Sequence, residues 1–268
     1  MEHIIGCTTR PYKDLPLDEA LARIAAAGYT DVALFNQQGQ VPVRADSTPS
    51  EVAAARQAAA DAGVTPSMVI GGTQLGLPLD EAVDNYRRLI TNVAAVGATW
   101  LLDCGTSNEA AFDKYLELMK QAASHAQDAG VRITMKPHGG ISLTAKQLQD
   151  AHRRVDHPAF TICYDPGNIL YYTKGERTPE EDVAGVAPIV ASVIIKDCAI
   201  SDGKPDVQVT PGDGLVDFPV VLGALVKADF SGPFYVECVG SSEPDAVDRD
   251  VAFALGYVRG ILATLKTD

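Results

Sequence analysis

Charged side chains end several apolar, strand-like runs of this sequence, and their types and spacing could do chemistry. The run from Val131 to Gly140 reads V-R-I-T-M-K-P-H-G-G and delivers Lys136 and His138. By the two-residue period of a strand, both share a face with Thr134. A lysine on the inner face of a core strand is costly unless it is paired or used. We therefore expect Lys136 to be central to the function, with His138 beside it.

Three later runs end in the same way. F-T-I-C-Y-D-P-G-N ends in Asp165 and Asn168, S-V-I-I-K-D in Lys196 and Asp197, and F-Y-V-E in Glu237. Two carboxylates and two lysines suit proton transfer next to a carbonyl, because a base takes the proton while a positive group stabilises the enediolate. The same groups could perform β-elimination or aldol cleavage, the latter through a Schiff base if a lysine pKa is depressed. The structural alternative is an internal network of ion pairs.

The elements that must position these residues appear as a repeat. Helix-like segments end at Gly28, Gly63, Gly97 and Gly130, which are 35, 34 and 33 residues apart, and each glycine is followed by an extended run. A glycine is suited to the left-handed conformation at a helix C-terminus. The period matches one strand-helix unit, and strict alternation of strands and helices predicts a parallel sheet.

Eight such units fit the chain, which predicts a single α/β domain over residues 1–268, a (β/α)8 TIM barrel. The predicted strands are Ile4–Thr8, Asp31–Phe35, Pro66–Ile70, Trp100–Cys104, Arg132–Lys136, Phe160–Tyr164, Ser192–Lys196 and Phe234–Cys238. The predicted helices are Leu17–Ala27, Pro49–Ala62, Leu79–Val96, Glu109–Ala129, Thr144–Arg153, Pro179–Val186, Pro219–Ala228 and Pro244–Leu265. A doubly wound sheet that binds a nucleotide usually has a Gly-rich turn after its first strand. The sequence has no such turn, so we expect no nucleotide cofactor.

Composition narrows the function classes. The 268 residues carry 22 Lys and Arg against 35 Asp and Glu, a net charge of −13, which disfavours nucleic acid and anionic membranes as partners. No apolar run is long enough to cross a bilayer and no signal peptide is evident, so we expect a cytoplasmic protein. The five cysteines are widely spaced and odd in number, which predicts reduced thiols rather than disulfides.

Motifs in the predicted strand order carry a family resemblance. P-G-D-G-L-V-D-F-P (Pro211–Pro219), the following G-P-F-Y-V-E, D-P-G-N, I-I-K-D and the N-terminal L-D-E-A-L-A-R-I-A-A-A-G-Y-T-D-V together resemble the sugar phosphate isomerase/epimerase family, the xylose isomerase-like TIM barrels. The similarity covers essentially the whole chain. It implies a small-molecule carbohydrate substrate, and homo-oligomers are common among such relatives, so a homo-oligomer is an expectation here too.

The resemblance also implies a divalent metal site with Glu, Asp, His and Glu ligands at the ends of strands five to eight. Asp165 and Glu237 match that pattern, whereas Lys136 and Ile194 replace the strand-five glutamate and the strand-seven histidine, and Asn168 replaces a histidine that often follows the aspartate. The metal site is therefore divergent.

Two interpretations of the divergent site stay open. In the favoured one the site is metal-free, because two ammonium groups can take the electrostatic role of a cation between carboxylates. In the other, a shifted ligand set of Asp165, Glu237 and His138 keeps a Mn²⁺ or Mg²⁺ ion.

The sequence thus predicts a sugar or keto-sugar isomerase or epimerase, with Lys136, Asp165, Glu237 and His138 as catalytic residues. The alternatives are a lyase on a keto sugar or polyol, and a non-catalytic sugar-binding or partner subunit. The predicted substrate-binding residues are Lys196, Asp197, Asn168, Gln208 and Arg10. The substrate, and whether it is phosphorylated, stays open.

Overall fold

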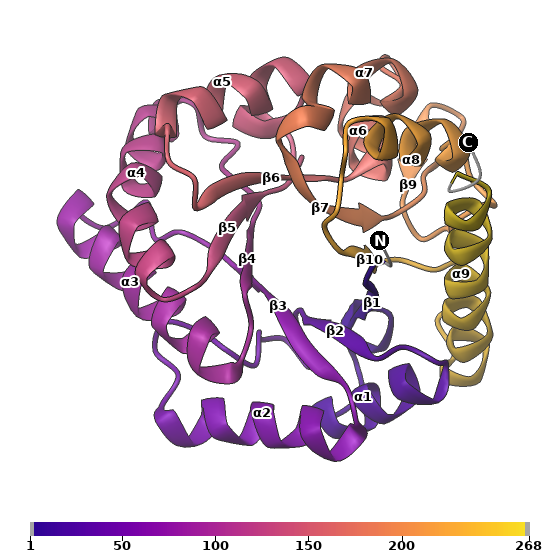
Figure 1. The fold of residues 1–268 in the computed structure, drawn as a ribbon, viewed down its shortest axis with the longest axis horizontal. Helices are drawn as coiled ribbons and strands as arrows, with labels where there is room; N and C mark the ends of the chain where they lie inside the picture. The colour runs from indigo at the N-terminus through magenta and orange to yellow at the C-terminus, as the bar shows by residue number, and fades with distance from the viewer. Residues whose placement is uncertain (1–2, 266–268) are drawn as a thin grey trace.

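A closed barrel of eight parallel strands forms the centre of the molecule (Figure 1), in a computed structural model that describes residues 3–265. The strand order around the barrel is β1-β10-β7-β6-β5-β4-β3-β2. The strands are β1 (Ile5–Thr8), β2 (Asp31–Leu34), β3 (Thr65–Gly71), β4 (Trp100–Asp103), β5 (Arg132–Met135), β6 (Phe160–Tyr164), β7 (Val190–Ile195) and β10 (Phe234–Val236). The single TIM barrel predicted from the sequence is confirmed.

Helices form the outer ring around these strands (Figure 1). They are α1 (Leu17–Ala26), α2 (Pro49–Ala62), α3 (Leu79–Val96), α4 (Phe112–Asp128), α5 (Ala145–Val155), α6 (Pro166–Thr173), α7 (Pro179–Val186), α8 (Phe218–Lys227) and α9 (Pro244–Leu265). Four short 3₁₀ segments accompany them, η1 (Arg10–Tyr12), η2 (Glu109–Ala111), η3 (Gly140–Ser142) and η4 (Ala187–Ile189). No helix within residues 3–265 is long and apolar enough to cross a membrane.

The glycine repeat sets the helix ends as expected. Gly63 and Gly97 are the C-cap residues of α2 and α3 with φ of 72° and 99°. Gly28 and Gly130 follow the C-cap residues of α1 and α4 and also have positive φ. Such backbone is easy only for glycine, so each helix stops there and the next strand begins.

Two apolar layers flank the strands. The larger fills the space between strands and helices and includes Ile133 and Met135. The smaller fills the barrel interior and consists of Ala33, Phe35, Met68, Leu102, Cys163, Ile194 and Tyr235. Because side chains alternate along a strand, a residue two positions beyond an interior residue also faces the interior if the strand direction continues.

The structure differs from the sequence expectation in three places. Helix α6 begins directly after β6, where no helix was predicted, and a hairpin of β8 (Ala199–Ser201) and β9 (Lys204–Asp206) lies in the long connection after β7. The predicted helix Glu109–Ala129 is divided into η2 and α4. All five cysteines are free thiols, as expected.

Candidate active site at the carboxyl end of the barrel

Four charged side chains meet above the barrel interior, each on the residue that follows a strand. Lys136 follows β5, Asp165 follows β6, Lys196 follows β7 and Glu237 follows β10. Asp165, Lys196 and Glu237 lie two positions beyond the interior residues Cys163, Ile194 and Tyr235, so strand parity aims them inward. All four are buried, with at most 3% of each residue exposed. We call them the charge cluster.

Each ammonium group of the charge cluster contacts both carboxylates. Lys136 Nζ lies 2.7 Å from Glu237 Oε2 and 3.3 Å from Asp165 Oδ2. Lys196 Nζ lies 2.8 Å from Glu237 Oε1 and 3.1 Å from Asp165 Oδ2. The cluster is therefore electrically balanced, which is the condition under which four charges can be buried together.

The pairing fixes the protonation states. Burial disfavours the Lys136 ammonium, but the neighbouring Glu237 and Asp165 carboxylates outweigh burial and raise the Lys136 pKa well above its ordinary value. Burial likewise opposes the Glu237 carboxylate, and Lys136 and Lys196 outweigh it and lower the Glu237 pKa. Lys136 is thus a permanent cation at neutral pH, suited to stabilising an anion and poorly suited to nucleophilic attack.

The charge cluster does not fit a divalent cation. Ammonium groups cannot ligate a metal ion, and here they occupy the space between the two carboxylates at hydrogen-bond distance. Within residues 3–265 no group of three or more His, Cys, Asp or Glu side chains is placed to hold a metal ion. The predicted ligands Asp165, Glu237 and His138 are not brought together, because the His138 ring bonds to Tyr172 instead. Binding of Mn²⁺ or Mg²⁺ stays a prediction for experiment.

Asn168 lies on α6 and makes hydrogen bonds to two residues of the charge cluster. Asp165 is the N-cap of this helix, and its Oδ1 accepts a hydrogen bond of 3.0 Å from the Asn168 backbone. The Asn168 side chain accepts from Lys196 Nζ at 3.2 Å and donates to the Pro137 carbonyl at 2.7 Å. It therefore joins the ends of β5, β6 and β7, and the substrate contact predicted from the sequence stays a prediction.

His138 lies at the rim rather than in the charge cluster. It is exposed, and the Tyr172 hydroxyl lies 2.9 Å from its Nε2. Strand β5 ends at Met135 and the chain turns at Gly139, whose φ is 77°, so the alternation of a strand does not fix the direction of the His138 side chain. Partial burial and the two nearby lysines lower the His138 pKa, which leaves a neutral imidazole at neutral pH.

Asp197 was predicted to bind substrate, and the structure gives it a different place. Its carboxylate is fully buried and accepts backbone hydrogen bonds of 2.8 to 3.0 Å from Cys198, Gly212, Gly214 and Val216. Asp197 has the opposite strand parity to Lys196, so it faces the loop and not the cavity. Its carboxylate organises the connection between β7 and α8.

An open cavity of about 560 Å³ lies above the charge cluster. Of the predicted residues, Lys136, Glu237, His138 and Arg10 line it. The lining residues that the sequence did not indicate are Lys13, Phe35, Asn36, Val41, Ile70, Gly71, Gly72 and Cys104. Phe35 and Cys104 follow β2 and β4 with inward parity, and that signal could have found them.

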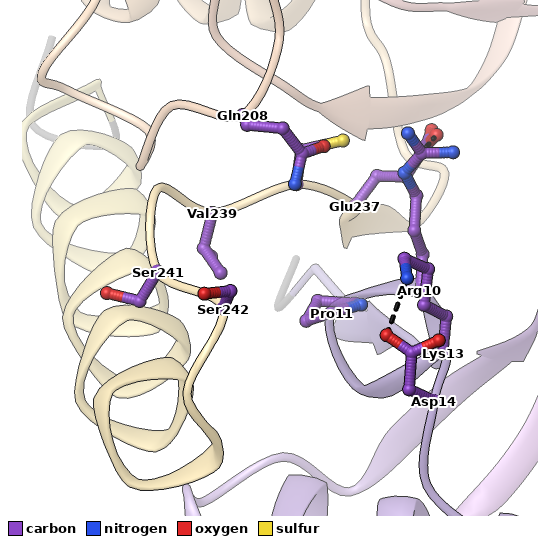
Figure 2. Close-up of a pocket in the computed structure, with 10 residues that line it drawn as sticks. Arg10, Pro11, Lys13, Asp14, Gln208, Glu237, Val239, Ser241 and Ser242 are labelled. Atoms are coloured by element: carbon purple, nitrogen blue, oxygen red, sulfur yellow. Dashed lines mark hydrogen bonds and ion pairs between the residues drawn. The ribbon is translucent and has the colours of Figure 1, made fainter.

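Gln208 and Arg10 line a smaller pocket beside this cavity (Figure 2). Its other lining residues include Lys13, Glu237, Ser241 and Ser242. Arg10, Lys13 and Glu237 belong to both spaces, so the small pocket adjoins the main cavity. Gln208 and Arg10 therefore lie next to the main cavity, and their contact with a substrate stays a prediction.

These features define a (β/α)8 barrel with a polar site at the carboxyl ends of its strands, which is where TIM-barrel enzymes bind substrate. A family model described as xylose isomerase-like TIM barrel matches residues 21–255, and the chain belongs to this family. The resemblance seen in the sequence is confirmed.

Individual relatives are distant. An inosose dehydratase of Glaesserella parasuis serovar 5 (strain SH0165) is 25% identical over 145 residues, which are 48% of this chain and 48% of that protein. The match thus spans about half the length of this curated relative. A xylose isomerase domain protein from Planctomyces limnophilus has a TM-score of 0.79 at 19% identity, with both chains covered completely. D-psicose 3-epimerase with D-tagatose, from Clostridium cellulolyticum H10, has a TM-score of 0.76 at 14% identity, over 96% of this chain and 99% of that one.

Proposed function

We propose that the protein is an enzyme that moves a proton at the carbon next to the carbonyl of a keto sugar, as an isomerase or epimerase. One observation carries this proposal: the Lys136 ammonium, held as a cation by the charge cluster, lines the same cavity as two acid-base groups, Glu237 and His138. This is the combination that enolisation needs.

The chemistry assigns each group a task. A base removes the proton from the carbon next to the carbonyl, and its electron pair moves toward the carbonyl oxygen. The oxygen becomes an enediolate oxyanion, which the Lys136 ammonium stabilises. Glu237 and His138 are the bases in reach of the cavity, and His138 is neutral and able to accept a proton at neutral pH. Return of the proton to the former carbonyl carbon, with transfer of the neighbouring hydroxyl proton to the oxyanion, isomerises the sugar, whereas return to the opposite face of the original carbon epimerises it.

The family membership supports sugar chemistry, and the similarity of fold to D-psicose 3-epimerase supports a keto sugar as the substrate class. Charge balance supports a reaction without a metal ion, because the two lysines already supply the positive charge. A Schiff-base aldolase is disfavoured, since the raised Lys136 pKa keeps the amine protonated.

A lyase is the second candidate, and the inosose dehydratase relative favours it. Dehydration starts with the same proton abstraction. The enediolate then expels the hydroxyl group on the next carbon, which leaves as water after taking a proton from an acid such as protonated His138. The same residues therefore serve both candidates, and the products distinguish them.

Proton exchange tests the proposed function without knowledge of the final product. Incubating the protein with D-psicose, D-tagatose, D-fructose or an inosose in D₂O should replace a carbon-bound hydrogen by deuterium, seen by NMR. Lys136→Met should slow exchange by about 10²- to 10³-fold, the effect of removing an oxyanion-stabilising group. The control Lys146→Met removes an exposed lysine that pairs with Asp150 on α5, and it should leave exchange unchanged.

Lys136→Met removes one of the two lysine partners of a buried carboxylate and could prevent folding. A second variant therefore tests the proposal independently. His138 is exposed, and His138→Gln should keep the melting temperature while slowing exchange by about 10²-fold or more. Exchange that proceeds at the wild-type rate in both variants would refute the assigned roles. No exchange with any keto sugar would favour the non-catalytic alternative.

A further inference from the structure

The small pocket beside the main cavity carries a surplus positive charge. Arg10 is the first residue of η1, and its side chain extends toward Glu237, whereas Gln208, Ser241 and Ser242 lie on the other walls (Figure 2). The pocket has a volume of about 70 Å³, against about 560 Å³ for the main cavity, and is large enough for a small anionic group. It adjoins the cavity above Lys136.

The guanidinium of Arg10 has donors to spare. Its nearest carboxylate oxygen is Glu237 Oε1, 3.9 Å from Nε, which is beyond hydrogen-bond distance. Both oxygens of that carboxylate already have closer lysine partners, at 2.7 and 2.8 Å. The Cys238 sulfur, which also lines the pocket, is a side-chain partner of Arg10, and within residues 3–265 no hydrogen bond joins the Arg10 guanidinium to an oxygen acceptor. Arg10 therefore adds a positive charge to a cluster that is already balanced.

The other walls add neutral donors and no free negative charge. Within the described residues, the side chains of Gln208, Ser241 and Ser242 make no hydrogen bond of their own, so all three are available to a ligand. The Asp14 carboxylate also lines the pocket, but it pairs with Lys13 at 2.5 Å. The pocket is thus positive in a protein whose net charge is −13.

From this arrangement we infer that the substrate of the proposed function carries an anionic group, a phosphate or a carboxylate, which binds Arg10 in the small pocket while the keto group lies at Lys136. A planar guanidinium with free donors matches the oxygens of either group in a bidentate geometry. Hydroxyl and amide donors opposite Arg10 complete the coordination of such oxygens. A neutral sugar would leave the surplus charge without a counterion.

Calorimetric titration of the wild-type protein at low salt tests the inference with matched probes. These are D-fructose, D-fructose 6-phosphate, 2-keto-D-gluconate and inorganic phosphate. An anionic sugar should bind about tenfold or more tightly than D-fructose, the effect of a hydrogen bond to a charged group. The phosphate and the carboxylate probes show which anion the pocket prefers. Arg10→Gln should abolish the difference, whereas Arg56→Gln, which removes an exposed arginine on α2, should preserve it.

Equal affinity for D-fructose and both anionic sugars would overturn the inference, and so would equal losses in Arg10→Gln and Arg56→Gln. Its failure is distinguishable from failure of the proposed function, on which it rests. Deuterium exchange with neutral sugars and no preference for anions would leave the function and remove the anionic subsite. Binding of anions that depends on Arg10, without any deuterium exchange, would support the anionic subsite and contradict the proposed function.

Discussion

Lys136 and Lys196 put two positive charges between two carboxylates where the family resemblance implies a divalent cation. Burying four charges costs solvation free energy that the ion pairs only partly offset, so such clusters contribute little to the stability of the fold. A hydrophobic replacement of similar volume would serve the fold as well. The Lys136 ammonium group lines the cavity, which agrees with the proposed role of stabilising an anion.

The variant Lys136→Glu should convert the charge cluster into a metal site. It would place a third carboxylate beside Asp165 and Glu237, and oxygen ligands suit Mn²⁺. Without metal, the repulsion among buried carboxylates should lower the melting temperature. Added Mn²⁺ should raise it again in proportion to the logarithm of its concentration, because a ligand stabilises the state that binds it.

Lys136→Gln is the matched control for this substitution, since it removes the same charge and adds no carboxylate. Its melting temperature, and that of the wild type, should not respond to Mn²⁺. Metal analysis of wild-type protein purified without chelator should find no stoichiometric Mn or Mg. A wild-type protein that retains one equivalent of metal, lost on mutating Asp165, would instead support the predicted set of Asp165, Glu237 and His138.

At the scale of elements, Asp197 holds the connection between β7 and α8 against the barrel. Asp197→Asn should weaken the hydrogen bonds from Gly212, Gly214 and Val216, because an amide presents one acceptor oxygen and no charge. Hydrogen exchange at these three amides should accelerate about tenfold or more, with smaller changes in α2. Asp213→Asn alters an exposed carboxylate of the same connection and should leave their exchange unchanged. Equal protection in both variants would contradict the role of Asp197.

The strand-helix repeat made the barrel predictable, because the periodic glycines and alternating apolar runs are local signals. The convergence of Lys136, Asp165, Lys196 and Glu237 followed from strand parity and the rim rule of parallel barrels. Their pairwise contacts could not follow, since they depend on side-chain conformations across four strands.

The remaining differences have local causes. Helix α6 has only eight residues and was not predicted, although Asp165 followed by Pro166 is an N-cap and first-turn pattern. The dipeptide Asp202-Gly203 is typical of tight hairpin turns and could have predicted the β8–β9 hairpin. His138 lines the cavity as predicted but lies outside the charge cluster, because β5 ends at Met135 and strand geometry does not extend to position 138.

Across the whole molecule, buried charge also sits at the opposite end of the barrel. Asp31 begins β2, is 5% exposed, and accepts hydrogen bonds from Ser67 and, at 2.8 Å, from the Tyr235 hydroxyl. Burial raises its pKa from 3.8 to about 6, against the lowering effect of those two donors. Burial does the same to Asp103, whose pKa is also about 6. Within residues 3–265 no lysine or arginine forms an ion pair with either carboxylate, unlike in the charge cluster.

The stability that Asp31 and Asp103 contribute should therefore decrease as pH rises from about 4 to above 6. A carboxylate whose pKa is higher in the folded than in the unfolded state binds protons more tightly when folded, so its stabilising effect is lost as pH rises through the folded value. For Asp31 the shift from 3.8 to about 6 corresponds to roughly 3 kcal/mol, of which roughly 2 kcal/mol is lost between pH 4.5 and pH 7.5. Urea unfolding at pH 4.5 and pH 7.5 should show that Asp31→Asn loses that part of the pH dependence, with the Asp103 part retained. Asp128→Asn, at an exposed position of α4, should behave like wild type. The same pH dependence of stability in Asp31→Asn and wild type would show that burial does not raise the pKa of the Asp31 carboxylate.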